Sequence, residues 1–167
     1  MSAKSSLSSK AANSARKSKH RPQHLARQRA LQALYQQQIN PQASSEIIAQ
    51  FLAMQDFSNV DEGYFQALVK TADQQREQII KDLSDYLDIK WDNLDAIECV
   101  ILSIGWVELT DQLQMPVKVV INEAIEMAKR YGAEKSHGFI NGVLDKYAQK
   151  ERALEIEMLE QQAGTGN

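Results

Sequence analysis

The sequence has few of the residues on which many small folds and catalytic sites depend. Its 167 residues include one cysteine and three prolines, and aromatic residues make up 7%. A single cysteine excludes an internal disulfide framework and favours a reducing compartment, so we expect a cytoplasmic protein. No apolar run approaches the roughly 20 residues of a membrane-spanning helix. The basic N-terminus also lacks the apolar stretch of a secretory signal.

Acidic residues are absent from the first 45 positions. Eight Lys or Arg residues precede the first acid, Glu46. Subtracting these eight from the 19 basic residues of the chain leaves 11 bases against 22 acids, a net charge of −11 on the remainder. This asymmetry favours a polyanion as the ligand at one end and a different, basic partner elsewhere. A solubilising tail with no specific ligand is the alternative interpretation.

Composition divides the chain into three parts. Residues 1–22 are rich in Ser, Ala and Lys without hydrophobic periodicity, which predicts a disordered basic extension. An organelle transit peptide has a similar bias, but the bases here are mostly Lys rather than Arg. We expect one folded domain over residues 23–150, which is long enough to bury a core. Residues 151–167 are expected to form a fraying acidic tail.

Apolar residues in the central part recur at helical spacing, with no strand alternation. Asn40 and Pro41 end a first helix. The apolar stripe over residues 64–87 predicts one long helix or two with a slight break. A further helix starts near Trp91, with Asp92 as its cap. The whole pattern predicts an all-α bundle of six or seven helices.

The segment from Gly132 to Lys146 resembles a catalytic site in composition only. Ser136 and His137 are adjacent, and neighbours on a helix point about 100° apart, so they cannot pair as nucleophile and base. Ser136 is better explained as a helix N-cap. We therefore predict that the chain has no catalytic residues and that the protein is not an enzyme.

Metal and cofactor motifs are also missing. His20 and His24 are four residues apart, but zinc needs further ligands and Cys99 is alone. No phosphate-binding glycine loop is present. We therefore predict neither a metal site nor a cofactor.

Two glycines in the same segment need an explanation. Gly138 and Gly142 are four residues apart and share one helix face. Each destabilises a helix by roughly 1 kcal/mol relative to alanine. We expect a close approach by another helix, or by a ligand, to offset this.

The turn before Ser136 suits an RNA ligand. A helix N-terminus attracts phosphate, and aromatic rings stack on unpaired bases. The candidate residues are Arg27, Arg29, Tyr131, Gly132, Lys135, Ser136 and Phe139.

Three segments carry a resemblance to a known family. They are RALQALYQQQ (29–38), ECVILSIGWVEL (98–109) and PVKVVINEAIEMAKRYGAEKSHGFINGVLDK (116–146). Together they resemble the NusB family of bacterial transcription antitermination factors, over about residues 27–148. The last segment alone also resembles the RNA-binding module of an rRNA cytosine methyltransferase. That enzyme carries a large cofactor-binding domain after the module, which we do not expect in a chain ending at Asn167.

The resemblance implies an all-α fold of two packed helical subdomains that catalyses no reaction. It implies binding of boxA RNA in leader and rRNA transcripts, as a heterodimer with NusE, a small-subunit ribosomal protein. NusA, NusG and RNA polymerase would complete the transcription complex. The resemblance leaves open whether the free protein forms a homodimer.

Matching positions place residues on two surfaces. The RNA surface would hold Arg27, Tyr131, Gly132, Lys135, Ser136 and Phe139, with a weaker match at Lys118. The NusE surface would hold Tyr35 and Glu98, which we expect to lie apart from the RNA-contacting turn. The chain departs from the family pattern where QHLAR replaces an arginine-rich run, at Ser103, where a base is common, and at Lys135, where an acid is common.

The basic extension is predicted to add RNA affinity without sequence discrimination, because it has no fixed structure to present base-reading groups. Deleting residues 1–21 should weaken binding to boxA and to scrambled RNA by similar factors, and should reduce the dependence of both affinities on salt. Titrations of both RNAs at several salt concentrations measure this. A loss confined to boxA would show that the extension reads sequence.

Overall fold

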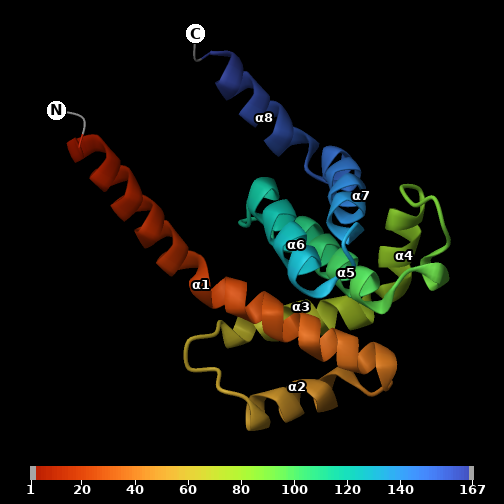
Figure 1. The fold of residues 1–167 in the computed structure, drawn as a ribbon. Coiled ribbons are helices and arrows are strands. Elements are labelled where there is room, and N and C mark those ends of the chain that lie inside the picture. Colours follow the sequence, from red (N-terminus) through yellow and green to blue (C-terminus); the bar gives the residue numbers. More distant parts are fainter. Residues whose placement is uncertain (1–2, 166–167) are drawn as a thin grey trace.

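All regular structure in the computed structural model is helical, over the described backbone of residues 3–165; side chains are described for residues 20–165. The elements are α1 (Ala3–Ile39), α2 (Ser44–Met54), α3 (Glu62–Gln74), α4 (Arg76–Ser84), the 3-10 helix η1 (Trp91–Asn93), α5 (Ala96–Asp111), α6 (Val117–Tyr131), α7 (Ser136–Glu151) and α8 (Ala153–Gly164) (Figure 1). The all-α prediction is confirmed. The predicted number of six or seven helices is wrong, because the described residues form eight α-helices.

Local breaks account for the additional helix. Gln75 leaves helical geometry (φ −103°, ψ 18°) and separates α3 from α4, which is the two-helix form of the prediction for residues 64–87. Arg152 (φ −115°, ψ 34°) separates α7 from α8. Asp92 lies in η1, and the residue before α5 is Asp95, so the predicted cap is wrong by one turn.

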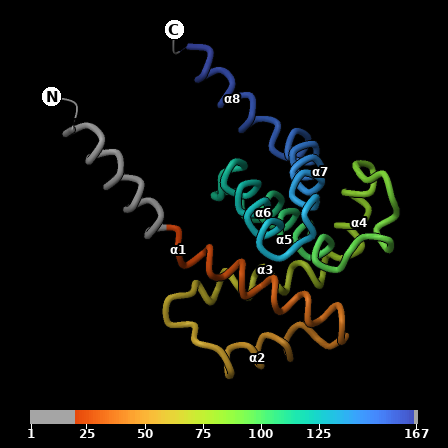
Figure 2. Tube along the Cα trace, viewed as in Figure 1, coloured from red at the N-terminus to blue at the C-terminus, as the bar shows by residue number. Residues whose placement is uncertain are grey.

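Figure 2 traces the described chain from red near residue 20 to blue at the C-terminal end. Nearly all of the predicted disordered extension, residues 1–22, lies outside it, because side chains are described only from His20 onward. Disorder of the extension therefore stays a prediction, as does the division of the chain at residues 22 and 150.

Helix α5 is the centre of the bundle. It packs against α1 and α3 on one side and against α6 and α7 on the other, while α2 covers α1 and α3 (Figure 1). Ten of its residues are buried, and a helix that is apolar on nearly all sides belongs in a core. The buried residues form one continuous cluster from Ala26 to Ala148. Among the described residues, no helix is both long and apolar enough to cross a bilayer.

The close helix contact of the bundle is at Gly105. A Cβ there would lie 2.8 Å from the side chain of Leu144, so glycine lets α5 and α7 approach each other. A Cβ at Gly138 or Gly142 would meet nothing within 4 Å. The prediction that this pair packs against another helix is therefore wrong within the described chain.

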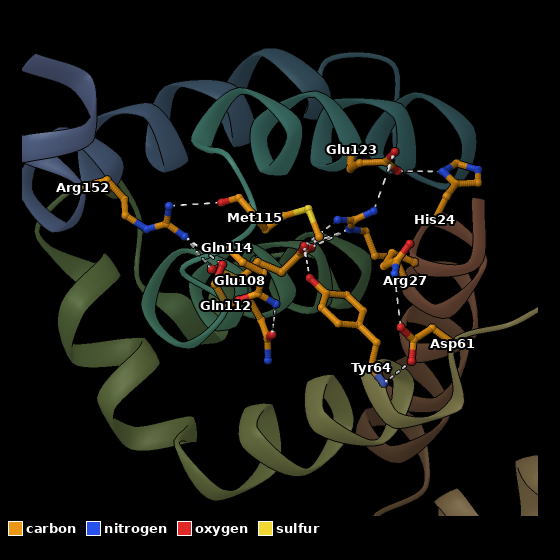
Figure 3. A network of polar contacts seen from close by, with 11 residues as sticks. His24, Arg27, Asp61, Tyr64, Glu108, Gln112, Gln114, Met115, Glu123 and Arg152 are labelled. Carbon is orange, nitrogen blue, oxygen red and sulfur yellow. Dashed lines mark hydrogen bonds and ion pairs between the residues drawn. The ribbon is translucent and has the colours of Figure 1, made fainter. Parts of the chain in front are cut away.

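A buried ion pair connects α1 to α5. Arg27 is 1% exposed, and its Nε donates to the two carboxylate oxygens of Glu108 at 2.8 and 2.9 Å, while Nη2 donates at 2.8 Å (Figure 3). The hydroxyl of Tyr64 on α3 donates to the same carboxylate. Burial acts to lower the pKa of Arg27, but the hydrogen bonds and charge of Glu108 outweigh it and raise the pKa. Burial, and then the charge of Glu108, raise the pKa of Tyr64.

A second buried arginine closes the far end of α5. The guanidinium of Arg152 donates to the backbone oxygens of Leu109 (2.7 Å), Glu108 (3.0 Å), Gln112 (3.1 Å) and Met115 (3.1 Å). The last carbonyls of a helix lack partners within it and carry the negative end of its dipole. Arg152 supplies both the hydrogen bonds and the charge.

Removing the acid of the buried pair should destabilise the fold strongly. Glu108→Ala leaves the guanidinium of Arg27 buried without a partner, and loss of one member of such a pair costs roughly 3–5 kcal/mol. Urea unfolding followed by circular dichroism measures the change in free energy of unfolding. Glu126→Ala, at an exposed position on α6, is the control and should change it by less than about 0.5 kcal/mol. A similar small effect at Glu108 would contradict the anchoring role.

Candidate nucleic-acid interface

Two adjoining cavities lie where α1, α2, α5 and the α6–α7 turn meet. One, of about 280 Å³, is lined by Tyr35 and Glu98 and by residues of the turn from Tyr131 to Ser136. The other, of about 560 Å³, extends along α1 and α2. Tyr35, Ile97 and Tyr131 line both. We call the two cavities together the shared groove.

Gly132 shapes the turn by its lack of a side chain. Its backbone (φ −92°, ψ 178°) is open to any residue, but a Cβ would lie 2.7 Å from the carbonyl oxygen of Ala128 and 3.2 Å from Cβ of Ser136. Ser136 is 4% exposed and is the first residue of α7. The N-cap position is Lys135, and no side chain caps the helix. The predicted capping role of Ser136 is therefore wrong: the serine packs beneath the turn.

The predicted aromatic contacts occupy different environments. Tyr131 is half-buried, lines both cavities and lies under the guanidinium of Arg130, with 5.3 Å from Cζ to the ring centroid. Phe139 is half-buried against the core and lines neither cavity. Lys118 and Lys135 are both exposed. Of the two predicted RNA-stacking rings, Tyr131 is thus the one that lines the groove. Lys135 lies on the turn, whereas Lys118 lies at the other end of α6.

The two predicted arginines of α1 differ. Arg27 is held in the buried pair with Glu108 and cannot reach a phosphate without leaving it. The structure thus gives Arg27 a role in the buried pair, and its assignment to the RNA surface stays a prediction. Arg29 is half-buried, and its Nε is buried without a hydrogen-bond partner. Its assignment to the RNA surface stays a prediction.

The predicted partner residues adjoin the RNA residues. Tyr35 is 39% exposed. Glu98 is half-buried and accepts a hydrogen bond from the backbone N–H of Asp95 at 3.4 Å, in a capping box at the start of α5. Both line the same cavity as Tyr131 and Gly132. The expectation that these two residues lie apart from the turn is therefore wrong, whereas their contact with NusE stays a prediction.

Some groove residues were absent from the sequence-based prediction. The larger cavity is also lined by Phe51 and by three glutamines, Gln32, Gln36 and Gln55. The concentration of glutamine in the first helix is the sequence signal that could have indicated them. Ser103 lines a separate cavity beside Cys99. Among residues with described side chains, no group of three or more His, Cys, Asp or Glu could hold a metal ion.

A matched glycine pair tests the geometry of the turn. Gly132→Ala should destabilise the protein, because the new Cβ meets a backbone oxygen that cannot move aside, whereas Gly142→Ala should stabilise it by about 1 kcal/mol, the helix propensity difference. Thermal unfolding of both variants measures this. The same change in unfolding temperature in both variants, or a higher unfolding temperature in Gly132→Ala, would contradict the close packing of the turn.

Comparisons with known proteins place the chain in one family. The family model described as "NusB family" matches residues 24–149. A transcription antitermination protein NusB from Nitrosococcus oceani is 44% identical over 131 residues, covering 78% of this chain and 88% of the relative. One from Alcanivorax borkumensis is 46% identical over 130 residues, covering 78% and 87%. These relatives are transcription antitermination factors and not enzymes.

Solved structures of NusB proteins have a similar fold. NusB of T. maritima has a TM-score of 0.72 and 26% identity over 81% of this chain and 97% of that one. A crystal structure of antitermination factors NusB and NusE in complex with dsRNA has a TM-score of 0.66 and 25% identity over 78% and 98%. With the family model covering most of the chain and relatives above 40% identity, the chain belongs to the NusB family.

Proposed function

We propose that the protein is a transcription antitermination factor that binds boxA-type single-stranded RNA of rRNA operon transcripts together with NusE. In this role it helps RNA polymerase to resist premature termination, in a cytoplasmic complex with NusA and NusG. The observation that carries the proposal is the shared groove. It is lined by three of the predicted RNA residues, Tyr131, Gly132 and Ser136, and by both predicted partner residues. A complex of a similar NusB with NusE and dsRNA supports the same pair of ligands.

The RNA side of the proposal uses the α6–α7 turn. The proposed RNA surface comprises Tyr131, Gly132, Lys135, Ser136 and Phe139 at or just after this turn, together with Arg29 on α1 and Lys118 at the other end of α6. Exposed cations contact phosphates and supply most of the affinity. The free N–H groups at the start of α7 add donors for a phosphate. Tyr131 offers a ring in an open groove, which suits an unstacked base and therefore single-stranded rather than duplex RNA.

The NusE side uses Tyr35 and Glu98. Ribosomal proteins are basic, and the chain beyond Ser45 carries a net charge of −11. Glu98 is partly desolvated in the groove, which makes a charge pair there stronger and more selective than one on an open surface. Tyr35 is exposed beside it and can bury a ring in the interface.

Two charge reversals should affect the two ligands differently. Lys135→Asp removes a phosphate contact and adds repulsion, so RNA affinity should fall roughly tenfold and its salt dependence should decrease, with NusE affinity unchanged.

Glu98→Lys places like charges together and should weaken NusE binding by at least tenfold. Calorimetry of each variant with boxA RNA and with NusE measures both affinities.

Two controls make the result specific. Glu98→Gln can still accept the hydrogen bond from Asp95 at the start of α5, so it separates the charge of Glu98 from its capping role. Duplex and single-stranded boxA RNA are compared because the similar complex contains dsRNA. Unchanged NusE affinity in Glu98→Lys, or a preference for the duplex, would contradict the corresponding half of the proposal.

A further inference from the structure

The C-terminal helix α8 has an exposed face that no other described element covers. None of its residues is buried, and Leu154 and Met158 are 77% and 60% exposed. Their spacing of four places them on one side of the helix. Figure 1 shows α8 pointing away from the rest of the bundle. Two exposed apolar side chains on one face of a helix favour the binding of another segment or protein there.

The chemistry around that pair is acidic. At 100° per residue, Glu155 and Glu157 fall on either side of Leu154 and Met158. Residues 151–167 contain four acids and one base, Arg152, which is buried. Glu157 and Glu160 are exposed and make no ion pair among the described side chains. The occupant is therefore expected to be basic.

The chain contains such a segment at its other end. Residues 1–21 hold six Lys or Arg and no acid. The sequence predicts a disordered extension here, and a disordered chain of that length reaches about 25 Å on average, from roughly 5–6 Å times the square root of its length. Pro22, which lies within α1, has no N–H for the helix and weakens it where the segment joins the body. The segment can therefore pivot at this point.

Glu108 in the core contacts an arginine near the base of each arm. The side chain of Glu108 holds Arg27 at the base of the N-terminal arm, and the backbone oxygen of Glu108 holds Arg152 at the base of α8. Figure 3 shows the two arginines approaching Glu108 from opposite sides. The two oppositely charged arms belong to one chain, so docking between them is intramolecular and does not depend on protein concentration.

We propose that residues 1–21 dock on the face of α8 formed by Leu154, Met158, Glu157 and Glu160, and that RNA competes with α8 for this basic segment. The docking does not depend on the proposed function, whereas the competition rests on it. The acidic helix thereby discourages unspecific RNA, because a ligand must first displace α8. If docking holds the segment in nine molecules out of ten, releasing it raises affinity roughly tenfold.

Energy transfer between the chain ends tests the docking without RNA. Dyes are placed at Ser2→Cys and Thr165→Cys in a Cys99→Ala background. Transfer should be high at low salt and fall steeply towards 1 M salt, where the Debye length is about 3 Å. Glu157→Lys with Glu160→Lys should abolish it at low salt. Glu46→Lys with Glu77→Lys, which makes the same charge change on α2 and α4, should retain it.

Equal transfer in the two double variants would overturn the docking, as would transfer that appears only when protein concentration rises, since the arms would then belong to different copies. Titration with an unstructured RNA oligonucleotide tests the competition. The α8 variant should bind it several-fold more tightly than the control variant, and equal affinities would overturn the competition. A protein that binds no RNA in any variant would contradict the proposed function and leave the energy-transfer result standing.

Discussion

The buried pair of Arg27 and Glu108 fixes how the two halves of the bundle meet. Two charges removed from water are tolerated only when their hydrogen bonds are satisfied, and here Tyr64 completes the carboxylate's contacts. The pair therefore allows α1, α3 and α5 one relative register. Tyr35 follows Arg27 by eight residues, about 12 Å along α1. The register set by the pair thus decides where Tyr35 meets the start of α5, and so where the groove forms.

Helix α5 is fixed by side-chain contacts at both of its ends. Its C-terminal carbonyls are held by Arg152, and its N-terminus is held by the capping box of Asp95 and Glu98. Glu98 thus has a structural task in the same position from which it faces the groove. Glu98 is therefore constrained both by the capping box and by the groove. A substitution that preserves binding can still destabilise the start of α5.

Much of the fold follows from the sequence, but the contacts within the site do not. Helical spacing and the Asn40–Pro41 stop are local signals, and they predicted the all-α architecture and the end of α1. The partner of Arg27, Glu108, is 81 residues away in the sequence. A local pattern therefore cannot show the pair, and Arg27 looks like one more basic residue next to the extension. Glu108 on an otherwise apolar stripe was the available sign of a buried partner. Gly142 shows the converse case, since its spacing suggested a contact and the structure leaves it open.

The distribution of charge orders the two proposed ligands. The acidic body repels RNA, so an RNA chain is drawn to the cations near the α6–α7 turn and to the basic extension. Glu98 lies in the same cavity as Tyr131, and its charge opposes a phosphate placed there. A basic partner that pairs with Glu98 removes this opposition. In the proposed function, partner and RNA therefore favour each other's binding, and linkage makes that effect equal in both directions.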